Sequence, residues 1–84
     1  MTHAELMIAI ETLRNELPEA PMSPYRLAKI VNETFSIDLP PQMMYNYVRN
    51  GLLNVVEQSG SKKISKDEAL AFIERYGLRN IVAK

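Results

Sequence analysis

The sequence predicts a mainly helical fold of four helices, with one short two-stranded hairpin before the last helix. Three observations support this prediction. Helix-start residues recur along the chain, apolar residues follow them at helical spacing, and glycines stand where two of the helices are expected to end. A chain of 84 residues suffices for one modest core, so we assign residues 1–84 to a single domain.

The first helix is expected over residues 2–17. Thr2 and Glu5 have the spacing of a capping box, in which each side chain satisfies the other residue's free backbone N–H. Pro18 ends the helix because a proline cannot donate the next backbone hydrogen bond. The apolar stripe that predicts the buried face consists of Leu6, Ile10, Leu13 and Leu17.

A second helix is expected to begin at Ser23 and to end near Glu33 or Phe35. Ser23-Pro24 combines a hydroxyl cap with a proline at the first helical position. A turn over residues 36–39 follows. The residues predicted to face inward are Leu27, Ile30 and Val31 in the helix, and Ile37 and Leu39 in the turn.

A third helix is expected from Pro40-Pro41 to about Asn50, so that residues 23–50 form a pair of consecutive helices. Gly51 follows directly, and a glycine at this place is typical of a left-handed helix stop. Its predicted apolar face is Met44, Tyr47 and Val48.

Residues 52–64 are predicted to form the hairpin, with strands at 52–57 and 62–64 around a turn at 58–61. Gly60 lies in that turn.

The last helix is expected over residues 65–77. Ser65 and Glu68 have the spacing of a second capping box, and Gly77 is predicted to end the helix. No structure is predicted for the tail, residues 78–84. The residues expected to face the core are Ala69, Leu70, Ile73 and Tyr76.

The composition argues against an enzyme, a metal site or a cofactor. There is no cysteine, and the one histidine, His3, lies at an end of the chain. The glycines, at 51, 60 and 77, have structural explanations, so no phosphate-cradling loop is expected. The longest apolar run is far shorter than the ~20 residues of a membrane span, and no cationic leader is seen. We therefore expect a cytoplasmic protein with no membrane contact.

The net charge is zero, but it is distributed unevenly along the chain. Residues 1–22 carry four glutamates and one arginine, whereas residues 23–63 carry five basic and three acidic side chains. The remainder has four basic and three acidic residues. Any basic surface for nucleic acid is therefore expected to be local and weak.

Four polar side chains share one face of the third helix, opposite its apolar face. Gln42, Tyr45, Asn46 and Arg49 stand at i, i+3, i+4 and i+7. Glutamine and asparagine can make paired hydrogen bonds to adenine, and arginine can do so to guanine. A tyrosine can reach a phosphate or pack on a sugar. The alternative is an ordinary solvated helix face, which every surface helix has.

The stretch LPPQMMYNYVRNGLL resembles the second helix of the MerR and excisionase winged-helix families. YRLAKIV is similar to the first helix of that motif, and SGSKKISKDEALAFIERY to the excisionase wing and the helix after it. The resemblance covers roughly residues 23–76. It implies a winged helix-turn-helix with an extra N-terminal helix, binding double-stranded DNA with helix 41–50 in the major groove. The positions that match directly are Pro41, Tyr47, Arg49, Gly51, Leu52 and Leu53.

The resemblance also implies contacts to the DNA backbone. Lys62 and Lys63 stand where the wing of these families touches DNA, although paired lysines can also simply keep an edge strand soluble. The first backbone N–H groups of the helix that begins at Ser23 could hold a phosphate. Arg26 is a further candidate on the same helix.

Three features depart from the family pattern. The link from Asn32 to Leu39 is several residues longer than the usual tight turn. The family's aromatic-acid pair is Tyr47-Val48 here, and its arginine on the reading helix is replaced by Tyr45. These departures leave the angle between the two helices and the base preference open.

The sequence thus favours a DNA-binding protein, either an excisionase-like accessory or architectural factor or a small transcriptional regulator. Because the 84 residues leave no room for a separate sensor, no small-molecule effector is expected. One neutral domain should discriminate poorly between sites, so self-association or cooperative binding on DNA is expected. The alternative is a protein-protein interaction module on the same scaffold without DNA binding.

Overall fold

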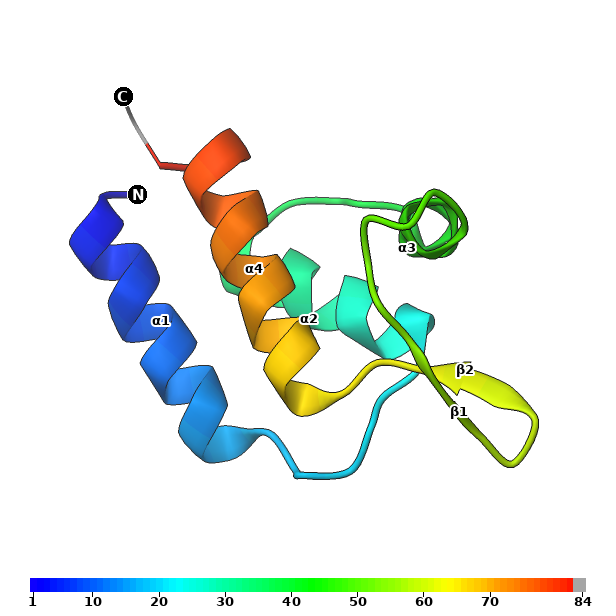
Figure 1. Ribbon diagram of the computed structural model, residues 1–84. Coiled ribbons are helices and arrows are strands. Elements are labelled where there is room, and N and C mark those ends of the chain that lie inside the picture. Colours follow the sequence, from blue (N-terminus) through cyan, green and yellow to red (C-terminus); the bar gives the residue numbers. More distant parts are fainter. Residues whose placement is uncertain (83–84) are drawn as a thin grey trace.

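The computed structural model of the chain describes residues 1–82. Four helices and a small antiparallel hairpin before the last helix form a mainly α fold, as the sequence predicted (Figure 1). In chain order the elements are α1 (His3–Glu16), α2 (Pro24–Phe35), α3 (Pro41–Arg49), β1 (Val56–Gln58), β2 (Ser61–Lys63) and α4 (Lys66–Asn80). α1 and α4 lie side by side and run in opposite directions, while α3 and the hairpin lie at the other end of the molecule (Figure 1).

The predicted capping box at the start of α1 is confirmed. The Glu5 backbone N–H donates to Thr2 Oγ1 at 3.1 Å, and the Thr2 backbone N–H donates to Glu5 Oε1 at 3.0 Å. Leu6 and Ile10 are buried, so the predicted stripe is the face that α1 turns toward α4.

Gly77 does not end α4, and that prediction is wrong. It lies inside the helix, which continues to Asn80, so residues 78–80 of the predicted tail are helical. A β-carbon at Gly77 would stand 2.6 Å from Leu6 Cδ1 and 3.1 Å from Phe35 Cζ. The glycine is therefore explained by the close approach of α1 and α2 to α4. The last two residues of the tail, 83–84, lie outside the described residues.

α2 and α3 begin and end close to the predicted residues. Ser23 caps α2, with its Oγ accepting the Arg26 backbone N–H at 3.1 Å. Gly51 has a φ of 75°, which confirms the left-handed stop after α3. Met44 is completely buried, and it anchors α3 to the core.

The long link between α2 and α3 is held by one side chain. Asn32 Nδ2 donates to the Leu39 carbonyl at 2.9 Å, and its Oδ1 accepts the Leu39 backbone N–H at 2.6 Å. Ser36 takes a left-handed conformation, with a φ of 54°, where α2 ends. The link is therefore an ordered turn, and its Ile37 and Leu39 pack against the core as predicted.

The hairpin is shorter than predicted and is shifted along the chain. β1 covers only Val56–Gln58 and β2 covers Ser61–Lys63, around a two-residue turn. Ser59 and Gly60 both have positive φ, at 53° and 78°, which suits the twist of a tight hairpin. Ile64 leaves the hairpin and pairs instead with Met22, by hydrogen bonds of 2.8 and 2.6 Å.

Residues 52–55, predicted as strand, are held by side chains of α4. Glu68 Oε2 accepts the Asn54 backbone N–H at 3.0 Å, and Arg75 donates to the Leu52 carbonyl at 3.4 Å. The second capping box is consequently only half formed. The Ser65 side chain accepts the Glu68 N–H, but the Glu68 carboxylate is turned to Asn54 and Arg75.

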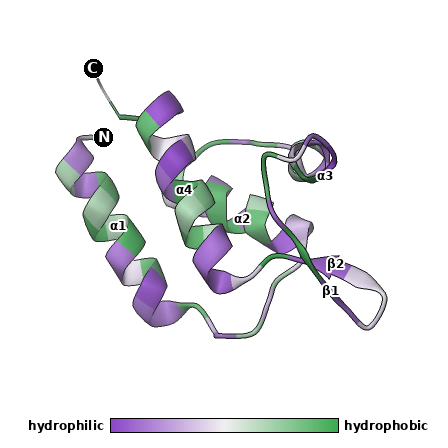
Figure 2. Cartoon of the chain, viewed as in Figure 1, coloured by the Kyte–Doolittle hydropathy of each residue, from purple (hydrophilic) through white to green (hydrophobic). Residues whose placement is uncertain are grey.

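One core joins the four helices and the segments that flank the hairpin, and its apolar residues lie on the inner faces of the helices (Figure 2). Phe72 and Leu53, which were not predicted to be buried, belong to it. The buried apolar residues are Leu6, Ile10, Met22, Leu27, Ala28, Ile30, Val31, Met44, Leu53, Ile64, Ala69, Leu70, Phe72 and Ile73.

Within residues 1–82, none of the helices has both the length and the apolar character that crossing a membrane requires.

Candidate nucleic-acid interface

A hollow of about 380 Å³ lies where the start of α2, α3 and the hairpin meet, which we call the α3–hairpin hollow. In Figure 1 these three parts lie together at the end of the molecule away from α1. Of the eight site residues that were predicted from the sequence, half belong to the lining of this hollow. The full lining is Ser23, Pro24, Tyr45, Val48, Ser61, Lys62 and Lys63.

The other predicted residues of α3 lie on its outer face, outside this lining. Gln42 and Arg49 are exposed, and Asn46 is partly buried. Gln42 Nε2 donates to Asn46 Oδ1 at 3.3 Å, so these two side chains are already aligned along the helix. Tyr45 is the one predicted residue of α3 that belongs to both the outer face and the hollow.

The start of α2 offers fewer free backbone N–H groups than the sequence suggested. Pro24 has none, and the Arg26 N–H is taken by Ser23 Oγ. Among the first three residues of α2, this leaves the Tyr25 N–H without a hydrogen bond inside the described part of the chain. A phosphate at this helix end would therefore meet one amide and the exposed side chains beside it.

The two lysines of β2 stand in different surroundings. Lys62 is exposed and lies directly opposite Glu57 in the hairpin register, whereas Lys63 is partly buried and lies opposite Val56. Neither lysine forms an ion pair with a residue in the range 1–82. Because Glu57 offsets part of its charge, we expect Lys62 to contribute less than Lys63 to the attraction of an anion.

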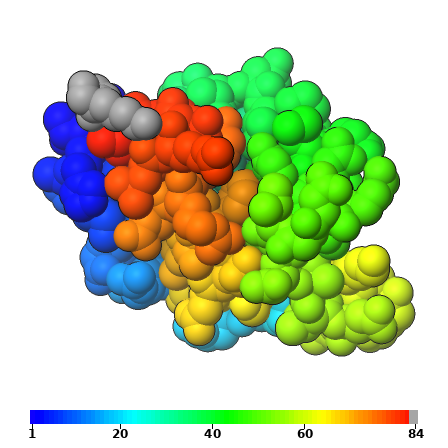
Figure 3. Space-filling model, turned by 45° about the horizontal axis from the view of Figure 1, so that its top comes forward, coloured from blue at the N-terminus to red at the C-terminus, as the bar shows by residue number. Residues whose placement is uncertain are grey.

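Glu57 of β1 lies beside this region, but the acidic residues of α1 are separated from it. No acidic side chain lines the α3–hairpin hollow, and the exposed carboxylates of Glu5, Glu11 and Glu16 all belong to α1. Figure 3 shows α1 and the hairpin at opposite edges of the face in view. The backbone N–H and the hydroxyl of Thr2 lower the pKa of Glu5, so this carboxylate keeps its negative charge.

Besides Pro24, three members of this region were not predicted as site residues from the sequence. Tyr25 is 61% exposed in the first turn of α2, next to Pro24 of the lining, and Val48 lines the hollow instead of facing only the core. Ser61 belongs to the lining because the hairpin turn is tighter than predicted. Tyr25 could have been found, since it stands outside the apolar stripe of α2.

The arrangement offers hydrogen-bond donors, aromatic edges and positive charge, and no group of acid, base and nucleophile is brought together in it. Within residues 1–82 no cluster of three or more histidine, cysteine, aspartate or glutamate side chains could hold a metal ion. Comparisons with protein-family models, with curated proteins and with solved structures find no match to this chain.

Proposed function

We propose that the protein binds double-stranded DNA as a winged helix-turn-helix, with α3 in the major groove and the hairpin acting as the wing. The α3–hairpin hollow is the observation that carries this proposal. It unites hydroxyls, a tyrosine and two lysines from three separate elements, directly beside the polar outer face of α3.

The dimensions and chemistry of α3 suit the major groove. An α-helix with its side chains is about 10–12 Å across, and the major groove is about 12 Å wide. Gln42, Asn46 and Arg49 supply the donors and acceptors that read base edges. Lys62, Lys63 and the start of α2 then lie to one side, where phosphates of the backbone would pass.

The biological role that we favour is an excisionase-like accessory or architectural factor, or a small transcriptional regulator. A single module of this size buries roughly 600–1,000 Å² on DNA, which limits its specificity. We therefore propose that productive binding uses more than one copy. Analytical ultracentrifugation with a duplex carrying the selected site tests this, and a fully specific one-to-one complex would contradict it.

The experiment that tests DNA binding is a fluorescence-anisotropy titration of a mixed-sequence duplex over a series of salt concentrations. Replacing Lys62 and Lys63 together by alanine should weaken binding to all sequences alike. The slope of log K against log salt should fall by about one unit for each phosphate that the variant no longer neutralises.

The matched control removes the same charge elsewhere, by the substitutions Arg14→Ala on α1 and Arg79→Ala near the end of α4, which lie outside the hollow. The control should leave the salt slope close to that of the parent. If the two double variants behave alike, the lysines of β2 serve solubility and do not touch phosphate.

Two exposed apolar side chains on the acidic helix favour a second candidate function, a protein-interaction module. Ile8 is 67% exposed and Met7 is 38% exposed, both on α1. Absence of any DNA binding at low salt would favour this alternative.

A further inference from the structure

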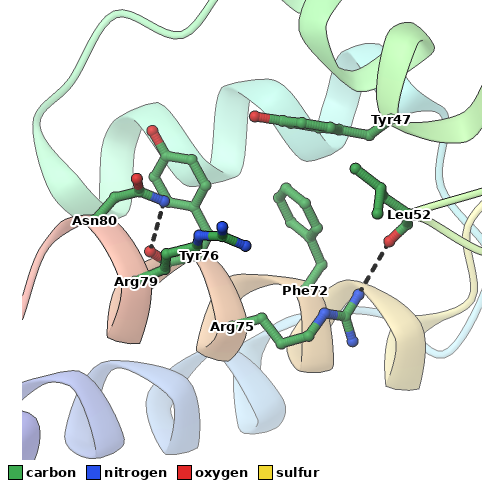
Figure 4. A pocket seen from close by; sticks show the side chains of 7 residues that line it. All are labelled: Tyr47, Leu52, Phe72, Arg75, Tyr76, Arg79 and Asn80. Carbon is green, nitrogen blue, oxygen red and sulfur yellow. Dashed lines mark hydrogen bonds between the residues drawn. The ribbon is translucent and has the colours of Figure 1, made fainter. Parts of the chain in front are cut away.

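A second cavity, of about 350 Å³, lies between α3 and α4, and we call it the α3–α4 cavity. It opens on the side of α3 opposite the polar outer face, because Tyr47 of its lining packs on Phe72 of α4. Figure 4 shows residues of α3, α4 and the segment between α3 and the hairpin converging on it. The lining is Tyr47, Leu52, Phe72, Arg75, Tyr76, Arg79 and Asn80.

The interior of the cavity is aromatic. The rings of Tyr47 and Phe72 have centroids 5.5 Å apart, and those of Phe72 and Tyr76 are 6.0 Å apart. Leu52 completes this apolar wall and is 60% exposed. An apolar group of a ligand would therefore find contacts here that water cannot make.

The rim of the cavity is positively charged. Arg75 and Arg79 stand one turn apart on α4, and no acidic side chain lines the cavity. Arg75 forms a salt bridge with Glu68 and donates a hydrogen bond to the Leu52 carbonyl, each at a long distance of 3.4 Å. Arg79 forms no ion pair within the described residues. Arginine is the side chain best suited to hold a carboxylate, because its planar fork can donate two parallel hydrogen bonds.

We propose that the α3–α4 cavity binds a small carboxylate that carries an aromatic or similarly apolar group. The ring would lie against Tyr47, Phe72 and Leu52, and the carboxylate would accept hydrogen bonds from Arg79 and Arg75. The cavity volume falls within the range of small-molecule sites. No separate sensor domain is required, since the site lies within the domain itself.

This site is connected to α3 and to the start of the hairpin segment. Tyr47 belongs to α3, and Leu52 opens the segment that Arg75 and Glu68 hold in place. A bound carboxylate would compete with Leu52 and Glu68 for Arg75. The binding site itself does not depend on the proposed DNA-binding function, and it can be tested in the absence of DNA.

The test is a titration of the ¹⁵N-labelled full chain with phenylacetate, followed by proton–nitrogen correlation spectra. Phenylacetamide, which has the same ring and no charge, is the matched ligand control. We expect saturable shifts of the Leu52 amide and of the Arg75 and Arg79 side-chain Nε–H groups with the acid. The amide should bind about tenfold more weakly, because it lacks the charge-assisted hydrogen bonds.

Arg79→Gln should weaken phenylacetate binding about tenfold, whereas Arg14→Gln, the same charge change on α1, should leave it unchanged. The spectra themselves report whether each variant is folded. Equal binding of acid and amide would overturn the proposal. Shifts centred on Lys62 and Lys63 would also overturn it, because they would indicate unspecific attraction of anions.

Discussion

The two ends of the molecule differ in how tightly they are packed and in which charged side chains they carry. At one end α1 and α4 approach so closely that Gly77 has no room for a side chain, and Leu6 is completely buried. At the other end the start of α2, α3 and the hairpin leave a hollow lined by polar and basic side chains. The first end is acidic on its outside, and the second carries the lysines of β2.

This difference shows that a net charge of zero does not mean an even distribution of charge over the molecule. The balance of charge is an average over two ends, and a ligand meets only one of them. Since screening reduces interactions beyond about 10 Å at moderate salt, the carboxylates of α1 have little influence on an anion at the hairpin. Substitutions that disturb one end at a time can therefore separate the contribution of one end from that of the other.

The largest effect is expected from Leu6→Ala, at the closely packed end. Removing a completely buried leucine leaves a cavity beside Gly77 and should cost about 2–5 kcal/mol of unfolding free energy. Urea denaturation, monitored by circular dichroism, measures this loss of unfolding free energy. Ile8→Ala, on the exposed side of the same helix, is the control and should change stability by less than about 0.5 kcal/mol. Equal costs for the two variants would mean that α1 is not docked as described.

The second prediction concerns the outer face of α3. Arg49→Ala and Asn46→Ala should each weaken binding to a selected DNA site by about 1–3 kcal/mol if they make paired contacts to bases. Stability should change little for Arg49→Ala, since that side chain is exposed. The measurement is anisotropy with a site selected from a random duplex pool. If both variants bind as tightly as the parent, α3 does not read the bases.

A smaller effect is expected from Asn32→Ala, which removes both hydrogen bonds to the Leu39 backbone. We expect a decrease of about 1–2 kcal/mol in unfolding free energy, because the backbone groups of Leu39 are left without a partner in a partly buried place. Glu33→Ala, at the exposed neighbouring position, serves as the control. A decrease no greater than that of the control would show that the link does not depend on Asn32.

The smallest effect is expected at Glu5. Because its pKa is lowered in the folded protein by hydrogen bonds from Thr2, the capping box stabilises the fold at pH values above the unfolded-state pKa. That contribution disappears as the pH falls through the folded-state pKa. An NMR titration of the Glu5 carboxyl should show the lowered pKa. Thr2→Ala removes the hydroxyl but keeps the backbone N–H that contributes most, so this variant should raise the pKa only part of the way toward the ordinary value. An ordinary Glu5 pKa in the parent chain would contradict the assigned cause.

The helices could be predicted from local signals, because caps such as Thr2, Ser23 and Ser65 act within a few residues. The hairpin could not be placed as well. Whether residues 52–55 form a strand depends on Glu68 and Arg75, which lie far along the chain. Gly77 was misassigned for the same reason, since its role depends on contacts with Leu6 and Phe35.

The candidate site likewise has a part that local sequence signals predict and a part that depends on long-range contacts. Gln42, Tyr45, Asn46 and Arg49 could be grouped from helical spacing alone, because they belong to one helix. The hollow could not be predicted, because it requires the tertiary placement of Ser23 and Lys63 beside Tyr45. The α3–α4 cavity also depends on a long-range contact, between Tyr47 and Phe72.

The measurement that tests the contrast between the two ends most directly is an NMR map of DNA binding. A proton–nitrogen spectrum of the labelled full chain is recorded with and without a short duplex at low salt. We predict that shifts concentrate on α3, on the start of α2 and on β1–β2, and that the outer face of α1 around Ile8 and Glu11 stays unchanged. Shifts centred on α1, or no shifts at any DNA concentration, would contradict this account.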